Sequence, residues 1–272
     1  MSTQPTVLPP TPSPFTNMAG VRSEDVQASE RLKIAIMGVP KSGKSWFAAT
    51  APGPIRYYDF DDRAESLEGK PGLYIISPPK LTMLTVESDL SVMKANKAKG
   101  LPLPTTIVFD SITSMVRAME EEIRRQAGTL FKAIKVGNST TVYKGKDWDV
   151  VVGIQRYVEY LVAELTTLGV NFIFVFHERD EKDNAESTKD ETKYTGKVIV
   201  SPQYLQNSLS LFNEVYRIIV TGKQEYKVTC KPTYDVLAST TMLLDAEEKP
   251  NIMDMITKHR AKRAALPKNA SK

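Results

Sequence analysis

The segment Gly38–Ser45, GVPKSGKS, has residue types and a spacing that could bind a triphosphate. Its glycines permit backbone angles that turn successive N–H groups toward one anion. Lys44 would reach the β- and γ-phosphates, and the Ser45 hydroxyl would ligate Mg²⁺. An apolar run precedes the segment and WFAAT, which can start a helix, follows it, so a helix dipole would add to the attraction. A chance Gly-Lys-Ser would lack this context. We predict a loop for ATP and Mg²⁺ formed by Gly38, Val39, Pro40, Lys41, Ser42, Gly43, Lys44, Ser45 and Trp46.

A candidate metal-holding acid ends the apolar segment Thr106–Asp110, TIVFD. At the carboxyl edge of a parallel sheet, beside a phosphate loop, Asp110 can hold the water shell of Mg²⁺. Many buried strands end in an acid for another reason, so Asp110 or Ser111 could instead cap the following helix. The phosphate loop upstream favours the metal role.

Two further carboxylates, Asp59 and Asp61, lie in the segment IRYYDFDD. Triphosphate hydrolysis needs an acceptor that positions the attacking water. In a strand these two acids share one face, so one could act as the base while the other makes structural hydrogen bonds. A solvated acidic turn is the alternative. The spacing alone does not order the two acids.

A sheet must bring these residues together, and the apolar pattern predicts one. Strands are expected at Leu32–Met37, Ile55–Phe60, Leu73–Ser77, Thr106–Asp110 and Val170–His177. Several are apolar at nearly every position, as in parallel strands covered on both faces. Helical spacing of apolar residues follows Asp110 and recurs over about 150–168. Val215–Thr221 and Tyr226–Lys231 are typical of an antiparallel hairpin. The predicted fold class is α/β, a mostly parallel central sheet covered by helices, with a C-terminal antiparallel hairpin.

The length of 272 residues suits one sizeable domain with tails. Five prolines among the first 14 residues predict a disordered arm at 1–30, followed by a core at 31–257. Residues 258–272 carry six basic side chains and no acid, so they form a basic tail that is either solvated or in contact with phosphates.

The remaining composition excludes some classes of protein. Cys230 is the only cysteine, which rules out an internal disulfide and fits a reducing cytosol. No run of 18 apolar residues occurs, so no membrane span and no membrane partner are expected. The net charge of +4 is a weak indication of a polyanionic partner.

Four segments in order, GVPKSGKS, YYDFDD, IVFDSITSM and FIFVFHE, resemble the RecA-like branch of P-loop ATPases. The chain is most similar to the compact, core-only RecA-like proteins of bacteriophages, AAA-type nucleotide-binding proteins linked to single-strand annealing. The resemblance covers about residues 31–240. It implies a RecA-like core that hydrolyses ATP to ADP and phosphate with Mg²⁺. It also implies a role in phage DNA recombination, annealing or repair in the cytoplasm of an infected bacterial host.

The resemblance also implies roles for a catalytic set of Lys44, Asp61, Asp110 and His177. Asp61 falls on the second acid of an acid-x-acid pattern, which polarises water, and Asp110 falls on the metal-site acid. His177 falls on the polar residue that senses the γ-phosphate and relays its state to a DNA-contacting loop, where RecA carries Gln. A core histidine satisfied by a backbone carbonyl is the alternative.

In this family, basic residues near the last hairpin reach the ATP of a neighbouring subunit, and Lys227 and Lys231 are the nearest matches. Because RecA-like sites normally lie between subunits, the resemblance implies a homo-oligomeric ring or filament with ATP at the interfaces. A separate DNA-gathering C-terminal domain is missing from the pattern, which argues against full strand exchange.

Two segments are candidates for contact with single-stranded DNA. Residues 128–146 hold lysines but no acid, with aromatic residues interleaved, so they could neutralise phosphates and stack bases. Residues 179–197 have mixed charge and follow His177, where the family has its second DNA loop. A solvated loop is the alternative. The candidate contacts are Phe131, Lys132, Lys135, Tyr143, Lys144, Lys146, Lys193, Tyr194 and Lys197.

The leading hypothesis is an ATPase that binds single-stranded DNA, is stimulated by it, and works beside a single-strand-binding protein. A nucleotide-gated interaction or assembly ATPase without DNA binding is the main alternative. A small-molecule kinase is a third, weakened because no Arg-rich lid over the nucleotide is apparent.

Overall fold

The computed structural model describes residues 31–127, 133–136, 140–143, 148–180, 198–222, 225–232 and 237–266. The chain divides into a unit of residues 1–30 and a unit of residues 31–272. The predicted Pro-rich arm is the first unit and lies outside the described residues.

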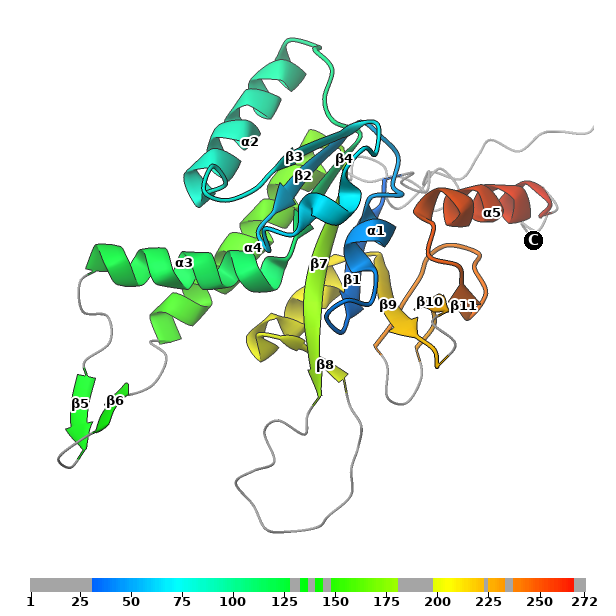
Figure 1. The fold of residues 1–272 in the computed structure, drawn as a ribbon. Coiled ribbons are helices and arrows are strands. Elements are labelled where there is room, and N and C mark those ends of the chain that lie inside the picture. Colours follow the sequence, from blue (N-terminus) through cyan, green and yellow to red (C-terminus); the bar gives the residue numbers. More distant parts are fainter. Residues whose placement is uncertain are drawn as a thin grey trace, which may run out of the picture. The chain divides into compact units, whose positions relative to one another are not determined.

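Within the described residues, nine strands form the main sheet (Figure 1). They are β1 (Lys33–Gly38), β2 (Ile55–Asp59), β3 (Leu73–Ile76), β4 (Thr106–Asp110), β7 (Asn171–Asp180), β8 (Val198–Ser201), β9 (Glu214–Val220), β10 (Tyr226–Thr229) and β11 (Glu247–Glu248). The order is β11-β10-β9-β1-β7-β4-β2-β3, and β8 pairs with the end of β7. The strands from β9 to β3 are parallel, whereas β10, β11 and β8 pair antiparallel with their neighbours. The α/β fold class, with a parallel sheet and a C-terminal antiparallel hairpin, is confirmed.

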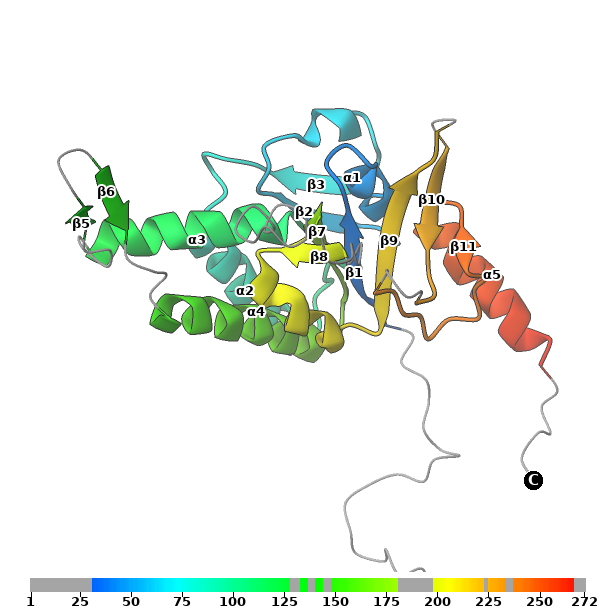
Figure 2. The same ribbon diagram turned by 90° about the horizontal axis from the view of Figure 1, so that it is seen from below.

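Helices cover both faces of the sheet. They are α1 (Lys44–Ala48), η2 (Ala64–Leu67), α2 (Met83–Ala98), α3 (Ile112–Ala127), α4 (Trp148–Leu168), η4 (Gln203–Leu211) and α5 (Ile252–Ala264). One apolar cluster joins α2, α3, α4 and η4 to the sheet, and a second joins α1, η2 and α5 to the opposite face. Figure 2 shows α3 and α4 on one side of β1 and β7, with α5 beside β10 and β11 on the other.

The alternation of side chains along β4 explains these two clusters. Ile107 and Phe109 pack into the cluster under α3 and α4, whereas Val108 packs into the cluster under α1. Successive residues of a strand point to opposite faces, so a strand covered on both sides must be apolar throughout. Thr106–Asp110 is buried at every position. The continuous apolar runs are therefore central strands, as predicted.

Two predicted boundaries differ from the structure. Strand β2 ends at Asp59, because the chain then turns through Asp62 with a left-handed φ of 52°. Asp61 therefore lies in a turn and does not share a strand face with Asp59. Strand β7 extends to Asp180, beyond the predicted end at His177, because β8 pairs with its last residues.

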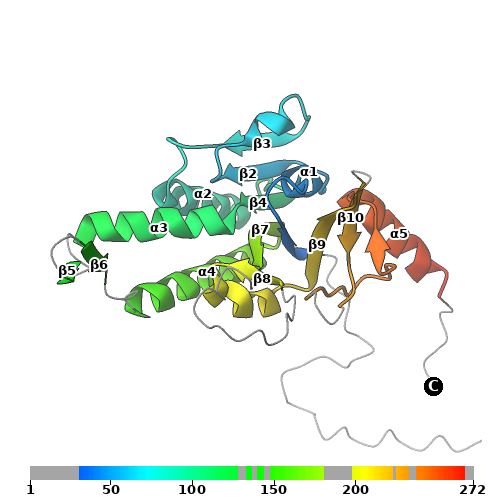
Figure 3. The same cartoon turned by 60° about the horizontal axis from the view of Figure 1, so that its bottom comes forward.

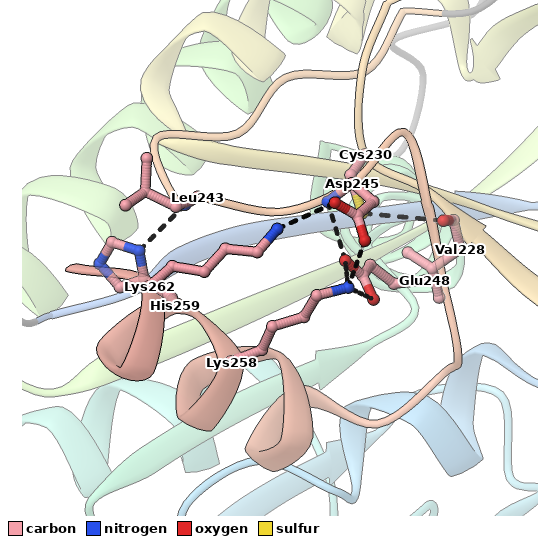
Figure 4. A network of polar contacts seen from close by, with 8 residues as sticks. All are labelled: Val228, Cys230, Leu243, Asp245, Glu248, Lys258, His259 and Lys262. Carbon is pink, nitrogen blue, oxygen red and sulfur yellow. Dashed lines mark hydrogen bonds and ion pairs between the residues drawn. The ribbon is translucent and has the colours of Figure 1, made fainter. Parts of the chain in front are cut away.

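The predicted border between core and basic tail, at residues 257/258, falls inside helix α5 (Figure 3). The helix begins where the Asn251 side chain accepts a hydrogen bond from the Asp254 N–H, and it buries Ile252, Met255 and Ile256. Its first basic residue, Lys258, donates to Asp245 and Glu248 (Figure 4). Apolar burial and these ion pairs hold the start of the tail on the core.

A small separate sheet, β5 (Ala133–Val136) and β6 (Thr140–Tyr143), joins α3 to α4 within the predicted DNA-contacting segment. In the part of the chain that the structure describes, no helix has the length and apolar character needed to span a membrane.

Candidate active site

The phosphate loop runs from the end of β1 into α1 and requires its glycines. Gly43 has φ 85°, in the left-handed region, and lies at the start of α1 without a side-chain cap. At Gly38, a Cβ atom would lie 2.6 Å from the Ser42 hydroxyl and 3.0 Å from the Ile218 carbonyl oxygen. Any larger residue would displace these groups. The loop therefore has the strand, turn and helix that the sequence predicted.

Two polar groups in this loop have the features expected of an anion site. The Ser42 hydroxyl is fully buried, and it is the one buried side-chain polar atom of the described residues without a hydrogen-bond partner. The Lys44 ammonium donates to the carbonyl oxygens of Gly38 and Val39 at 2.9 and 2.8 Å. Burial lowers the Lys44 pKa, which the nearby charge of Asp110 partly opposes. An anionic ligand would stabilise this ammonium, so the residues present fit a bound phosphate.

The predicted metal residues are in direct contact. The Ser45 hydroxyl donates to Asp110 Oδ2 at 2.5 Å, across the edge where β4 ends beside α1. Burial raises the Asp110 pKa, and hydrogen bonds from Ser45 and Tyr57 oppose this rise. A hydroxyl and a carboxylate are oxygen ligands suited to Mg²⁺. The pair therefore fits a Mg²⁺ ion held through Ser45 with Asp110 behind its water shell.

The alternative role of this segment, capping the next helix, is filled by Ser111. Its hydroxyl accepts a hydrogen bond from the Ser114 N–H at 3.2 Å, at the start of α3. The carboxylate of Asp110 points toward Ser45 instead. Asp110 thus faces the candidate metal site, and the neighbouring Ser111 caps the helix.

The structure separates the two acids that the sequence could not order. Asp59 is buried, and its Oδ2 accepts hydrogen bonds from the N–H groups of Arg63 and Ala64 and from the Ser77 hydroxyl, at 2.8, 2.9 and 3.0 Å. These contacts hold the turn after β2 against the end of β3. Asp59 therefore has a structural role.

Asp61 lies at the carboxyl edge of the sheet, where it contacts two other predicted site segments. Its Oδ1 accepts from the Ser111 hydroxyl at 2.9 Å, and its Oδ2 lies 3.0 Å from Nε2 of His177. Burial acts to raise the Asp61 pKa, but hydrogen bonds led by that from His177 outweigh it and leave the pKa well below its usual value. Asp61 is therefore an ionised carboxylate beside the phosphate loop.

His177 is held at this edge by the register of β7. Its Cα is paired with that of Gly38, the last residue of β1, and its N–H donates to the Thr113 hydroxyl at 3.1 Å. The imidazole meets a carboxylate rather than the backbone carbonyl that a purely structural core histidine was expected to use. The predicted base and the predicted phosphate sensor are thus direct neighbours.

Comparison with known protein families shows the family to which this chain belongs. A family described as an AAA domain matches residues 30–249, a range that contains the phosphate loop, Asp61, Asp110 and His177. The chain belongs to this AAA domain family. Together with the phosphate loop, the membership identifies a P-loop ATPase domain.

Among solved structures, a KaiC-like protein from the hyperthermophilic archaeon Pyrococcus horikoshii OT3 is similar, with a TM-score of 0.40 and 15% sequence identity. The similarity covers 77% of this chain and 82% of that one. No curated protein matches the chain in sequence.

One ion pair of this AAA domain has no counterpart in the sequence prediction. Glu178, next to His177, accepts a hydrogen bond from Arg217 Nε at 2.9 Å. The charge of Glu178 is among those that raise the Lys44 pKa against burial, so the pair lies close to the phosphate loop. Glu178 is the last letter of the FIFVFHE segment, but no motif indicates its arginine partner on β9.

Four of the other predicted contact residues lie within the described part of the chain. Lys227 on β10 pairs with Glu247 at 3.0 Å, and Lys231 is exposed beyond the end of β10. Of the DNA candidates, Lys135 and Tyr143 lie on β5 and β6. The remaining candidates lie outside the described residues, and they are Phe131, Lys132, Lys144, Lys146, Lys193, Tyr194 and Lys197.

Proposed function

We propose that this P-loop ATPase depends on Mg²⁺, that Asp61 orients the attacking water, and that single-stranded DNA controls its turnover. The DNA-linked activity would be recombination, annealing or repair in the cytoplasm of a phage-infected bacterium. The contact between Asp61 and His177, 3.0 Å apart at the edge of the phosphate loop, carries the proposal. It joins the candidate hydrolytic residue to the strand that leads into a candidate DNA-contacting segment.

The chemistry follows from four side chains. Lys44 and the loop N–H groups bind the phosphate oxygens, and Ser45 with Asp110 holds Mg²⁺, which neutralises phosphate charge when bound. Because the Asp61 pKa lies below its usual value, its carboxylate accepts a hydrogen bond from water without removing the proton in the ground state. Asp61 therefore acts mainly by orienting the water in line with the leaving group.

Coupling to DNA would run along β7. The residues that flank segment 181–197, Asp180 and Val198, are paired in the β7–β8 ladder, and the same ladder pairs His177 with Ser201. A strand of DNA that shifts this segment would change the position of His177 and hence its hold on Asp61. A ligand can shift such an equilibrium only through its different affinities for the two arrangements.

The same proposal includes a second DNA contact and an oligomer. The β5–β6 hairpin carries Lys135 and Tyr143, a cation and an aromatic ring suited to a phosphate and a base. A homo-oligomeric ring or filament, with Lys227 and Lys231 near the ATP of the next subunit, extends the RecA-like resemblance. A single-strand-binding protein would be a further partner.

The test is the rate of ATP hydrolysis by the full chain, with and without single-stranded DNA, at low and raised salt. We expect turnover that depends on Mg²⁺ and is stimulated by DNA. Raised salt should suppress the stimulation, because contacts with DNA phosphates release counterions. Lys44→Ala should abolish turnover and leave the thermal unfolding transition in place. A rate that ignores DNA, with no shift of an oligonucleotide on a gel, would refute the DNA role and favour the nucleotide-gated assembly ATPase. Wild-type turnover in Lys44→Ala would refute the active site itself.

A further inference from the structure

A third side chain joins Ser45 and Asp110 at the candidate metal site. Tyr57 Oη donates a hydrogen bond to Asp110 Oδ2 at 2.5 Å, the same oxygen that accepts from Ser45 Oγ. Tyr57 lies on β2 and its Cα is paired with that of Val108 on β4, two residues before the acid. The tyrosine side chain is completely buried. The phosphate-loop pattern does not include this residue.

Both donors bind the same oxygen of the Asp110 carboxylate. Among the described residues, both hydrogen bonds to the Asp110 carboxylate go to Oδ2, and no donor to Oδ1 is found. This arrangement leaves Oδ1 for a water molecule on the metal ion. A hydroxyl that donates its proton keeps two lone pairs, so Ser45 can bind Asp110 and a cation together. The direction of those lone pairs depends on where Asp110 is held.

We propose that Tyr57 is a positioning residue of the Mg²⁺ site, an inference that rests on the ATPase function proposed above. The phenol and the Ser45 hydroxyl both donate to Asp110 Oδ2, and two donors on one oxygen restrict rotation of the carboxylate about its Cβ–Cγ bond. Partners of this kind, one step removed from the metal, typically change metal affinity by roughly 10- to 100-fold when they are lost. Tyr57 thus orients the ligand set without touching the nucleotide.

The experiment follows nucleotide binding rather than turnover. A fluorescent ATP analogue is held at fixed concentration while Mg²⁺ is titrated into wild-type protein and Tyr57→Phe. We expect Tyr57→Phe to need roughly 10- to 100-fold more Mg²⁺ for half-maximal response. Its affinity for the analogue without Mg²⁺ should be unchanged.

Tyr216→Phe is the matched control. Tyr216 is equally buried in the same apolar cluster as Tyr57, and its hydroxyl donates to Glu214 Oε2 at 2.6 Å, on β9. Each variant loses one buried tyrosine hydroxyl, so any general loss of packing or stability appears in both. Tyr216→Phe should keep the wild-type Mg²⁺ requirement.

Equal Mg²⁺ requirements in wild-type protein and a folded Tyr57→Phe would overturn the inference and leave nucleotide binding intact. Absence of any nucleotide binding by wild-type protein would instead overturn the proposed function, and this inference with it. If Tyr57→Phe does not fold, the test uses protein in which the tyrosines are replaced by fluorotyrosine. Tyr226 is first changed to Phe in this protein, because it also borders the loop at Gly43 and its signal would be confused with that of Tyr57. Addition of Mn²⁺ with ATP should then broaden one fluorine signal far more than the others, and no such broadening refutes the role.

Discussion

The division of roles between Asp59 and Asp61 gives the sharpest test of the site. Asp59 accepts three hydrogen bonds at one carboxylate oxygen, two of them from backbone N–H groups of the turn after β2. Asp61 instead meets Ser111 and His177 at the edge of the phosphate loop. We therefore expect Asp59→Asn to lower stability and Asp61→Asn to lower turnover.

The size of the Asp59 effect follows from its contacts. Hydrogen bonds to charged groups contribute about 1.5–3 kcal/mol, and neutral ones about half as much. An amide keeps the acceptor oxygen but loses the charge, so each bond loses about half of its contribution and the three together lose about 2–4.5 kcal/mol. For a domain of this size, that loss lowers the melting temperature by about 4–18 °C. Turnover per folded molecule should stay near the wild-type value.

Asp61→Asn should behave in the opposite way. Its side chain is 12% exposed and has two hydrogen-bond partners, Ser111 and His177, so the same reasoning gives a smaller stability loss of about 1.5–3 kcal/mol. Loss of the carboxylate that orients water should reduce kcat by about 10²- to 10⁴-fold, with nucleotide affinity retained. Urea unfolding, phosphate release and nucleotide binding, measured on both variants, separate the two outcomes.

Either of two results would refute this reasoning. One is an Asp61→Asn protein that hydrolyses ATP at the wild-type rate. The other is an Asp59→Asn protein of wild-type stability that has lost its turnover. The second result would exchange the roles of the two acids, since Asp59 ends β2 and Asp61 lies in the turn that follows it.

Three further predictions concern groups outside the hydrolytic residues. Burial raises the Cys230 pKa to about 12, so the native protein should not react with a disulfide reagent at pH 8, whereas urea-unfolded protein should react fully. Hydrogen bonds, first that from Lys258, lower the Asp245 pKa to about 2, so its stabilising effect is present above about pH 4 and lost as pH falls toward 2. Asp245→Asn should therefore lower the melting temperature at pH 6 but not at pH 2. Gly43→Ala should cost about 1–2 kcal/mol because of its left-handed φ and should weaken nucleotide binding, whereas Gly153→Ala, with open space around it in α4, should be neutral or stabilising.

Much of the framework could be predicted from local patterns. A phosphate loop is contiguous, so its glycines, lysine and serine specify their chemistry within eight residues, and the flanking strand and helix confirm the context. The central strands are apolar at nearly every position because both faces are covered. The predicted core included Ile252, Met255 and Ile256, but no helix was predicted over Ile252–Ala264, because basic residues dominate its second half and the acids that pair with Lys258 precede the helix in sequence.

The contacts that assemble the site depend on strand order, which no local pattern contains. Tyr57 and Asp110 are 53 positions apart, and Ser45 and Asp110 are 65 apart. They meet because β4 lies between β2 and β7, and β7 lies between β4 and β1, so four carboxyl ends share one edge. The sequence predicts which residues can carry phosphate chemistry, since backbone conformation and residue type are local properties. Their pairing as neighbours, including Asp61 with His177, is decided by tertiary packing, because register and strand order minimise the free energy of the whole sheet.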